Sequence, residues 1–316
     1  MRKIAEALTD ATKIIGRLVS YVKFNKYFFS VITRMNLSPE TLRTYKSVID
    51  KLETLEHIDF DGPNHSIRLH STLMHYLNTH IPNPGSRKVY VSAILNEIRS
   101  WPAEAKKPYI DLNASLRKTT AQTAISQTLK EARKTNMLAW HNVLALKKKA
   151  LETLTPEDFL IYCLYTLAPP VRADYAEMPV VGYYGKTHKN DIKKNYCVMH
   201  DRNGYFIFNK YKTEKKYGQL KIPIPSELYT VIKERVNVGE LLLPSVSSPS
   251  TLSKRVMTIF TKLSGKAMGI GLLRHSYITT YLSTVQRITD KADLAMRMMH
   301  SWVTQETYHI ISSDEE

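Results

Sequence analysis

The stretch NYCVMHDRNGYFIFNKYKTEKKYGQLKIPIP (195–225) decides the fold class, because β-type residues concentrate there in a chain whose other segments have helical patterning. Its segments NYCVMHD, YFIFNKYK and GQLKIPIP are rich in Tyr, Val, Ile and Phe, and the turn-like runs DRNG and KTEKKYG separate them. Residues 201–204 have the composition of a hairpin turn. The stretch therefore predicts a small β-sheet within a mainly α-helical protein.

Predicted helices flank this sheet on both sides. Before it, ALETLTPEDFLIYCLYTLAPP (150–170) has Thr155 and Pro156 at the start of its main helix and two prolines at its end. After it, apolar residues recur at helical spacing in SELYTVIKERV (226–236), STLSKRVMTIFTKL (250–263), LRHSYITTYLS (273–283) and DKADLAMRMMHS (290–301). Together these segments predict an α+β domain over 140–316.

The N-terminal part of the chain is predicted to be helical. Ser38 is a good N-cap and Pro39 suits the first helical position, so we expect a compact helical domain over 35–101 and a helical extension over 1–34. Residues 102–139 are polar and basic, which predicts an interdomain linker that lies along a phosphate backbone. An ordinary solvated loop and helix fits that composition equally well.

The charge of the chain indicates a polyanionic partner. Its 316 residues, enough for about two domains, include 45 Lys and Arg against 29 Asp and Glu, which gives a net charge of +16. Each phosphate that such a surface neutralises releases counterions, so the excess favours binding to nucleic acid. The basic residues recur along most of the chain, which predicts a long binding surface.

Cysteine usage and hydropathy favour a reducing, intracellular compartment, either the cytoplasm or the nucleus of a host cell. Cys163 and Cys197 show no CxxC spacing and give no sign of a disulfide framework or a zinc site. No apolar run reaches the ~18 residues that a membrane span needs, so no membrane association is expected. The first predicted helix contains Glu6 and Asp10, which argues against a cleaved signal peptide.

Five side chains in the C-terminal half have the chemistry that phosphodiester cleavage needs. They are Arg172 in APPVRADY, Lys212 in NKYKTEKK, Arg274 in LLRHSY, His300 in RMMHSW and Tyr308 in TQETYHI. Cations can neutralise nonbridging oxygens, a lysine can protonate the leaving oxygen, and a tyrosine can act as the nucleophile. The chain has no P-loop motif and no convincing carboxylate set for two-metal chemistry, so no metal or other cofactor is expected.

The order and spacing of these residues resemble those of the tyrosine recombinases, or phage-type integrases. The family pattern is an early arginine, a lysine in a β-hairpin turn, a His-x-x-Arg motif, a histidine or tryptophan, and the tyrosine nucleophile. Arg172, Lys212, Arg274, His300 and Tyr308 match these positions in turn. The resemblance implies site-specific breakage and rejoining of double-stranded DNA through a 3′-phosphotyrosyl link, without metal or ATP, by a dimer to tetramer assembled on DNA.

The resemblance extends to the N-terminal helical domain. The family's core-binding domain usually opens with a Ser-x-x-Thr-x-x-x-Tyr run, and Ser38, Thr41 and Tyr45 repeat that spacing. Residues 35–101 would then form a SAM-like DNA-binding domain, and 140–316 would form the catalytic domain.

The chain departs from the family pattern at two places. Gly271 stands where the family usually has the histidine of the His-x-x-Arg motif, and Tyr308 follows His300 by eight residues, one fewer than the commonest family spacing. The sequence around Arg172 and Lys212 is closest to the divergent branch found in crypton transposons and in viruses of eukaryotes.

Several alternatives remain open from the sequence. Either His275 or water could take the phenol proton of Tyr308, although His275 directly follows Arg274 on a helix and is better explained as a packing residue. Gly271 raises the possibility of an inactive relative that binds DNA without cutting it. A type IB topoisomerase would use similar chemistry, and a basic scaffold or RNA-binding protein would share the charge.

Overall fold

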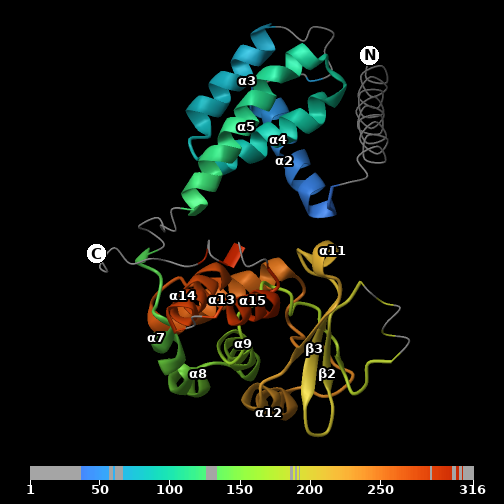
Figure 1. The fold of residues 1–316 in the computed structure, drawn as a ribbon, viewed down its shortest axis with the longest axis vertical. Coiled ribbons are helices and arrows are strands. Elements are labelled where there is room, and N and C mark those ends of the chain that lie inside the picture. The colour runs from blue at the N-terminus through green and yellow to red at the C-terminus, as the bar shows by residue number, and fades with distance from the viewer. Residues whose placement is uncertain are drawn as a thin grey trace, which may run out of the picture. The chain divides into compact units, whose positions relative to one another are not determined.

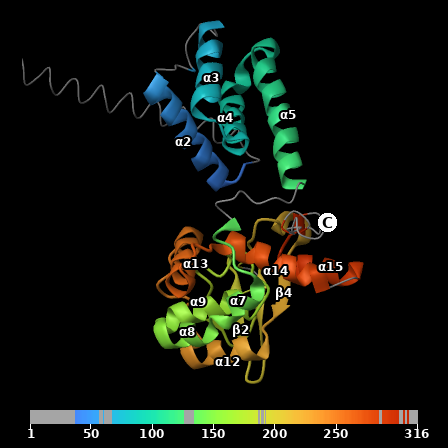
Figure 2. The same cartoon turned by 90° about the vertical axis from the view of Figure 1, so that its left-hand side faces the viewer.

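The computed structural model describes residues 37–56, 60, 67–125, 134–185, 188, 191, 193–284, 287–300, 304–305 and 308. Figures 1 and 2 show the fold in two views. The chain divides into two compact units between Ala121 and Gln122. The predicted N-terminal extension over 1–34 lies outside the described residues. No helix in the described ranges combines the length and the hydrophobicity that a membrane span requires.

Unit 1 is helical, as the sequence predicts. Its elements are α2 (Pro39–Glu56), α3 (Ile67–His80), α4 (Pro84–Glu97), the 3₁₀-helix η1 (Ile98–Ser100) and α5 (Ala103–Ile125). The predicted start of α2 is confirmed, because Ser38 Oγ accepts a hydrogen bond from the Thr41 backbone N–H at 3.2 Å. Asn83 caps α4 in the same way and accepts from the Ser86 N–H at 3.1 Å. These caps fix where the chain enters each helix.

Helix α5 differs from the predicted basic linker over 102–139. Residues 103–125 form a continuous helix, and its Tyr109 and Leu116 are buried in the core of unit 1. Tyr109, Leu112 and Leu116 recur at the spacing of one helical face, which the many Lys, Thr and Ser residues around them concealed in the sequence. Most of α5 is therefore a packed part of unit 1.

Within the described residues, unit 2 combines helices with one small sheet, as predicted. Its helices are α7 (Trp140–Ala145), α8 (Lys147–Thr153), α9 (Pro156–Thr166), α11 (Glu214–Tyr217), α12 (Ser226–Arg235), α13 (Pro249–Ser264), α14 (Ile270–Thr284) and α15 (Ile288–Arg297). The helices predicted after the sheet are confirmed as α12 to α15. Helix α9 begins as predicted, because Thr155 Oγ1 accepts from the Asp158 N–H at 3.2 Å.

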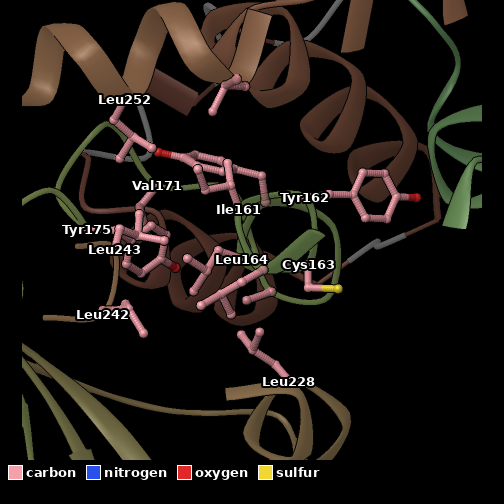
Figure 3. Close-up of a cluster of buried hydrophobic side chains, with 14 of the residues drawn as sticks. Ile161, Tyr162, Cys163, Leu164, Val171, Tyr175, Leu228, Leu242, Leu243 and Leu252 are labelled. Atoms are coloured by element: carbon pink, nitrogen blue, oxygen red, sulfur yellow. The ribbon is translucent and has the colours of Figure 1, made fainter. Parts of the chain in front are cut away.

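Helix α9 is the centre of the unit 2 core. Every residue from Phe159 to Thr166 is buried, which is typical of a helix that is surrounded on all sides. Helices α12 and α13 pack against it. Figure 3 shows Leu164 of α9 in a buried cluster that includes Leu228 of α12 and Leu252 of α13. The loop that carries Arg172 leaves directly from this rigid element.

The sheet of unit 2 has the strand order β1-β2-β3-β4. The strands are β1 (Val180–Val181), β2 (Tyr196–Met199), β3 (Gly204–Phe208) and β4 (Leu220–Pro223). Strands β2, β3 and β4 are the predicted segments, and each pairs antiparallel with the next. The predicted turn over 201–204 is confirmed, since the His200 N–H donates to the Asn203 carbonyl at 2.9 Å. Strand β1, parallel to β2, was not predicted because two residues carry no alternation pattern.

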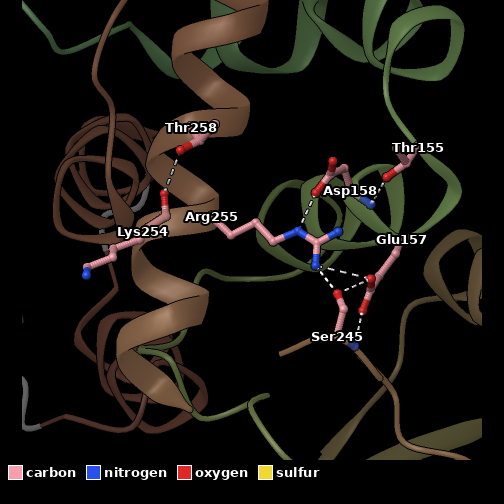
Figure 4. Close-up of polar contacts among 7 residues, drawn as sticks. All are labelled: Thr155, Glu157, Asp158, Ser245, Lys254, Arg255 and Thr258. Carbon is pink, nitrogen blue, oxygen red and sulfur yellow. Dashed lines mark hydrogen bonds and ion pairs between the residues drawn. The ribbon is translucent and has the colours of Figure 1, made fainter. Parts of the chain in front are cut away.

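A polar cluster fixes α13 against the start of α9 (Figure 4). Arg255 Nε on α13 donates to Asp158 Oδ1 at 2.6 Å, and its Nη1 lies 3.1 Å from Glu157 Oε2. Glu157 also accepts a hydrogen bond from the Ser245 backbone N–H at 3.0 Å. The charged groups are partly buried, so solvent screens this network less than an exposed ion pair. The network holds α13 in place. Helix α14, which carries Arg274, follows α13 in the chain.

We expect Leu164→Ala to destabilise unit 2 by about 2–5 kcal/mol, because Leu164 is fully buried and its truncation leaves a cavity. Leu151 on the neighbouring helix α8 is 59% exposed, and Leu151→Ala removes the same atoms. This control should change the free energy of unfolding by at most about 0.5 kcal/mol. Urea unfolding followed by circular dichroism measures both. Equal effects of the two substitutions would contradict this assignment of the core.

Candidate active site

Arg274 on α14 is almost completely buried, with 1% of its surface exposed. Its Nη1 donates to the Pro170 carbonyl at 2.6 Å, and its Nη2 donates to the Met298 carbonyl at 3.3 Å and to His300 Nδ1. Among the described residues, no group accepts a hydrogen bond from its Nε. A buried guanidinium is thus held by neutral acceptors and keeps one donor that an anion could use.

Met299 joins Arg172 to the connection between β3 and β4. Its carbonyl oxygen accepts from Arg172 Nη1 at 3.2 Å and from Thr213 Oγ1 at 3.0 Å. Met299 has φ 56°, a left-handed conformation that costs a non-glycine residue of order 1–3 kcal/mol. The adjacent Met298 carbonyl accepts from Arg274. The segment after α15 therefore directs successive carbonyl groups at both arginines.

His300 and Tyr308 stack on each other beside Arg274. Their ring centroids are 5.7 Å apart with 15° between the planes, and Arg274 Cζ lies 5.0 Å from the Tyr308 ring centroid. Because an arginine can only donate, His300 Nδ1 accepts from Arg274, and the ring proton is on Nε2. That nitrogen lies 3.4 Å from Gln305 Oε1, and Gln305 Nε2 donates to the Lys291 carbonyl at 3.1 Å. Gln305 thereby links the imidazole to α15.

His275 contacts Tyr308 through the backbone. Its Nδ1 lies 2.8 Å from the Tyr308 carbonyl oxygen, and the two rings are 4.8 Å apart between centroids. An imidazole that donates to this carbonyl holds the tyrosine in place. This polar contact is with the main chain of Tyr308, and the ring of His275 lies beside the phenol ring.

The charges around Tyr308 favour its phenolate form. Burial of the phenol opposes ionisation, but the charge and contact of Arg274, together with the charges of Arg172 and Lys212, lower the pKa of Tyr308 below its ordinary value. Lys212 is itself exposed, in the connection between β3 and β4. Cations from three separate elements therefore act on one hydroxyl group.

Unit 2 thus brings together the five residues singled out from the sequence. Direct contacts join Arg274, His300 and Tyr308. A hydrogen bond to the Met299 carbonyl attaches Arg172 to the segment that carries His300. The charge of Lys212 helps to lower the pKa of Tyr308. These residues are far apart in the sequence. They come together because hydrogen bonds join the segments after α9 and α15, the β3–β4 connection and Arg274.

Sequence reasoning missed the groups that hold these side chains. The Met299 carbonyl accepts from Thr213 Oγ1 and from Arg172. No sequence motif or spacing predicts a hydrogen bond to a backbone carbonyl. Asp174, by contrast, is predictable from the sequence as a neighbour of Arg172, because it follows that arginine by two residues. Burial raises the pKa of Asp174 to about 6, although the charges of Arg172 and Arg274 oppose the rise. No described group donates a hydrogen bond to its Oδ2.

Gly271, the glycine three residues before Arg274, lies at the second position of α14 and is exposed. A Cβ atom added to it would meet no atom within 4 Å. A Cβ atom would therefore fit at this position, and crowding at the backbone does not explain the glycine.

The site contains cationic and imidazole groups that suit an anionic ligand. Within the described ranges, no group of three or more His, Cys, Asp or Glu side chains is arranged to hold a metal ion.

The chain is similar to XerA recombinase, known from a crystal structure, with 12% sequence identity and a TM-score of 0.39 over 92% of this chain and 94% of that chain. No family model matches the chain, and no curated protein matches it.

The environment of His300 predicts a specific pH dependence of stability. Burial and the charge of Arg274 lower the pKa of His300 to about 3. As the pH falls from about 6.5, the unfolded chain gains a proton at this residue and the folded chain does not, so the free energy of unfolding falls by up to about 1.4 kcal/mol per pH unit. His300→Gln should remove this contribution, and urea unfolding between about pH 7 and 4.5 measures it. The same slope in both proteins would show that His300 is protonated in the folded state.

Proposed function

We propose that this protein is a tyrosine recombinase that breaks and rejoins double-stranded DNA at specific sites through a phosphotyrosyl intermediate at Tyr308. The observation that supports it best is the surroundings of the phenol: Arg274 lies over the ring, His300 stacks on it, and the charges of Arg172 and Lys212 help to lower its pKa. The order of these residues along the chain, which resembles the family pattern, supports the same assignment independently.

The two arginines would bind the scissile phosphate. Arg274 Nε, which no described group accepts from, would donate to a nonbridging oxygen, and Arg172 would neutralise the charge that builds on the second. Guanidinium groups suit this role because their donors match the geometry of a phosphate. His300 is neutral at physiological pH and would contribute the hydrogen bond of its Nε2–H rather than a charge.

The transfer step follows from this arrangement. The Tyr308 hydroxyl oxygen attacks phosphorus as its proton passes to water, the new O–P bond forms, and the bond from phosphorus to the 5′ oxygen breaks. Lys212 gives a proton to that leaving oxygen, which departs as a 5′-hydroxyl. The DNA is then linked to the protein through a 3′-phosphotyrosine. Because the ester bond is retained, a second 5′-hydroxyl can reverse the step and rejoin the strand.

A type IB topoisomerase is the nearest alternative, because it would use the same step on one strand. The helical unit 1 resembles the core-binding domain of recombinases, through Ser38, Thr41 and Tyr45, and so favours recombination. Recombination would require a dimer to tetramer on DNA, whereas a topoisomerase would relax any supercoiled plasmid as a monomer. Relaxation of plasmid without a specific site, with no joining of two DNA molecules, would favour the topoisomerase.

Tyr308→Phe should abolish covalent linkage to DNA, because it removes the attacking oxygen and little else. DNA affinity should stay nearly unchanged. Denaturing gel electrophoresis of the protein with a nicked suicide substrate measures the link, and a gel shift measures binding. A Tyr308→Phe protein that still becomes linked to DNA would disprove the assigned nucleophile, and a wild-type protein that binds DNA without ever linking to it would support an inactive relative.

Arg172→Ala should slow formation of the covalent link by about 10²–10³-fold, because one charged donor to the developing phosphate charge is lost. Arg202→Ala offers a matched control, since Arg202 is an exposed arginine in the turn between β2 and β3. It should leave the rate of linkage at saturating DNA nearly unchanged. Similar rates for the two variants would remove Arg172 from the site.

A further inference from the structure

The turn that carries Lys212 is anchored on both sides. On its C-terminal side, Thr213 Oγ1 donates to the Met299 carbonyl, which also accepts from Arg172. On its N-terminal side, the backbone of Asn209 and Lys210 is held by a single side chain from the segment before β2. The exposed lysine between these anchors has a flexible four-carbon stem, so the position of its backbone decides what its ammonium group can reach.

The side chain that holds the N-terminal side is Asn195. Its Nδ2 donates to the Asp174 carbonyl and to the Lys210 carbonyl, each at 3.0 Å. Its Oδ1 accepts from the Asn209 N–H at 3.0 Å and from the Lys210 N–H at 2.8 Å. These four bonds use both donors and both lone pairs of the amide. Because backbone groups engage all the hydrogen-bonding capacity of this amide, the side chain is held in one orientation. The same bonds fix the backbone of its partner residues relative to one another.

The partners of Asn195 belong to the two segments that carry catalytic candidates. Asp174 follows Arg172 by two residues in the loop after α9, and Lys210 precedes Lys212 by two residues in the β3–β4 connection. One amide thus couples the arginine loop to the lysine turn. In the part of the chain that the structure describes, the Met299 carbonyl forms a second connection between the arginine loop and the lysine turn, because it accepts from both Arg172 and Thr213. The two connections share no residue.

We infer that Asn195 is a positioning residue for Lys212, fixing the turn so that the ammonium group reaches the leaving 5′ oxygen. The inference rests on the proposed function, since it assigns Lys212 the role of proton donor. Asn195 itself contacts neither DNA nor the phenol in this role. A shift of about 1 Å in the lysine backbone would be enough to impair proton transfer substantially.

A substrate with sulfur in place of the bridging 5′ oxygen separates positioning of the proton donor from every other function of the site. A thiol ionises at much lower pH than an alcohol, so the 5′-thiolate leaves without a proton. The attack by Tyr308 and the binding of the phosphate by Arg172 and Arg274 are still needed. Loss of the proton donor alone therefore slows cleavage of the oxygen substrate and spares the sulfur substrate.

Asn195→Ala should slow covalent linkage to the oxygen substrate by about 10- to 100-fold, and linkage to the sulfur substrate should stay within about threefold of wild type. Lys212→Ala sets the upper limit of this selectivity. Asn237→Ala is the matched control: it removes another loop amide, which bonds to Glu240 after α12, and should change neither rate. Single-turnover rates on both substrates, at saturating protein, give the ratio for each variant.

Equal slowing on both substrates, or no slowing on either, would overturn the role of Asn195. Should Asn195→Ala melt well below the wild type, Asn195→Asp replaces it: the shape and the two accepted bonds are kept, and the two donated bonds are lost. The ratio of oxygen to sulfur rates then decides in the same way. Failure of the proposed function looks different, because wild-type protein would then link to neither substrate.

Discussion

The burial of one guanidinium group constrains the rest of unit 2. Arg274 is removed from water, and a charge in that position costs several kcal/mol unless hydrogen-bond acceptors surround it. The acceptors are the carbonyl groups of Pro170 and Met298 and the ring of His300. These come from the loop after α9 and from the segment after α15. Satisfying one cation therefore draws together the two segments that also carry Arg172 and the imidazole.

The same electrostatic field has opposite chemical consequences for the two aromatic groups of the site. Positive charge stabilises a phenolate, so the pKa of Tyr308 falls in spite of burial. Positive charge and burial both disfavour an imidazolium, so His300 remains neutral. A tyrosine prepared for ionisation thus stacks on a histidine that offers a neutral hydrogen bond. In the proposed reaction, the positive charge that acts on the phosphate would come from Arg172, Arg274 and Lys212 and not from the imidazole.

The sequence predicted those helices and strands whose start or composition depends on residues close together in the chain. Ser38 and Thr155 are caps that bond within three residues, and the sheet segments are marked by composition and by a tight turn. Helix α5 was not predicted because only three of its large apolar residues, Tyr109, Leu112 and Leu116, face the core, and they are few among many polar ones. Strand β1 was not predicted because it is two residues long. In the site, residue types and order were readable. The Met299 carbonyl was not, since a backbone group has no identity in a sequence and its direction depends on tertiary contacts.

In the proposed reaction, a phosphate bound by Arg172 would compete with the carbonyl group that now accepts from this arginine. Charge-assisted hydrogen bonds to phosphate are stronger than those to a neutral carbonyl, so the proposed exchange at Arg172 would be favourable. Its carbonyl partner belongs to Met299, whose left-handed backbone already stores unfavourable energy that a change of conformation would release. The same carbonyl holds Thr213, next to Lys212. In the proposed reaction, binding of the phosphate at Arg172 and placement of Lys212 would therefore be coupled through the Met299 peptide group. The bonds of Asn195 to the Asp174 and Lys210 carbonyls would keep the lysine turn attached to the arginine loop if that group moved.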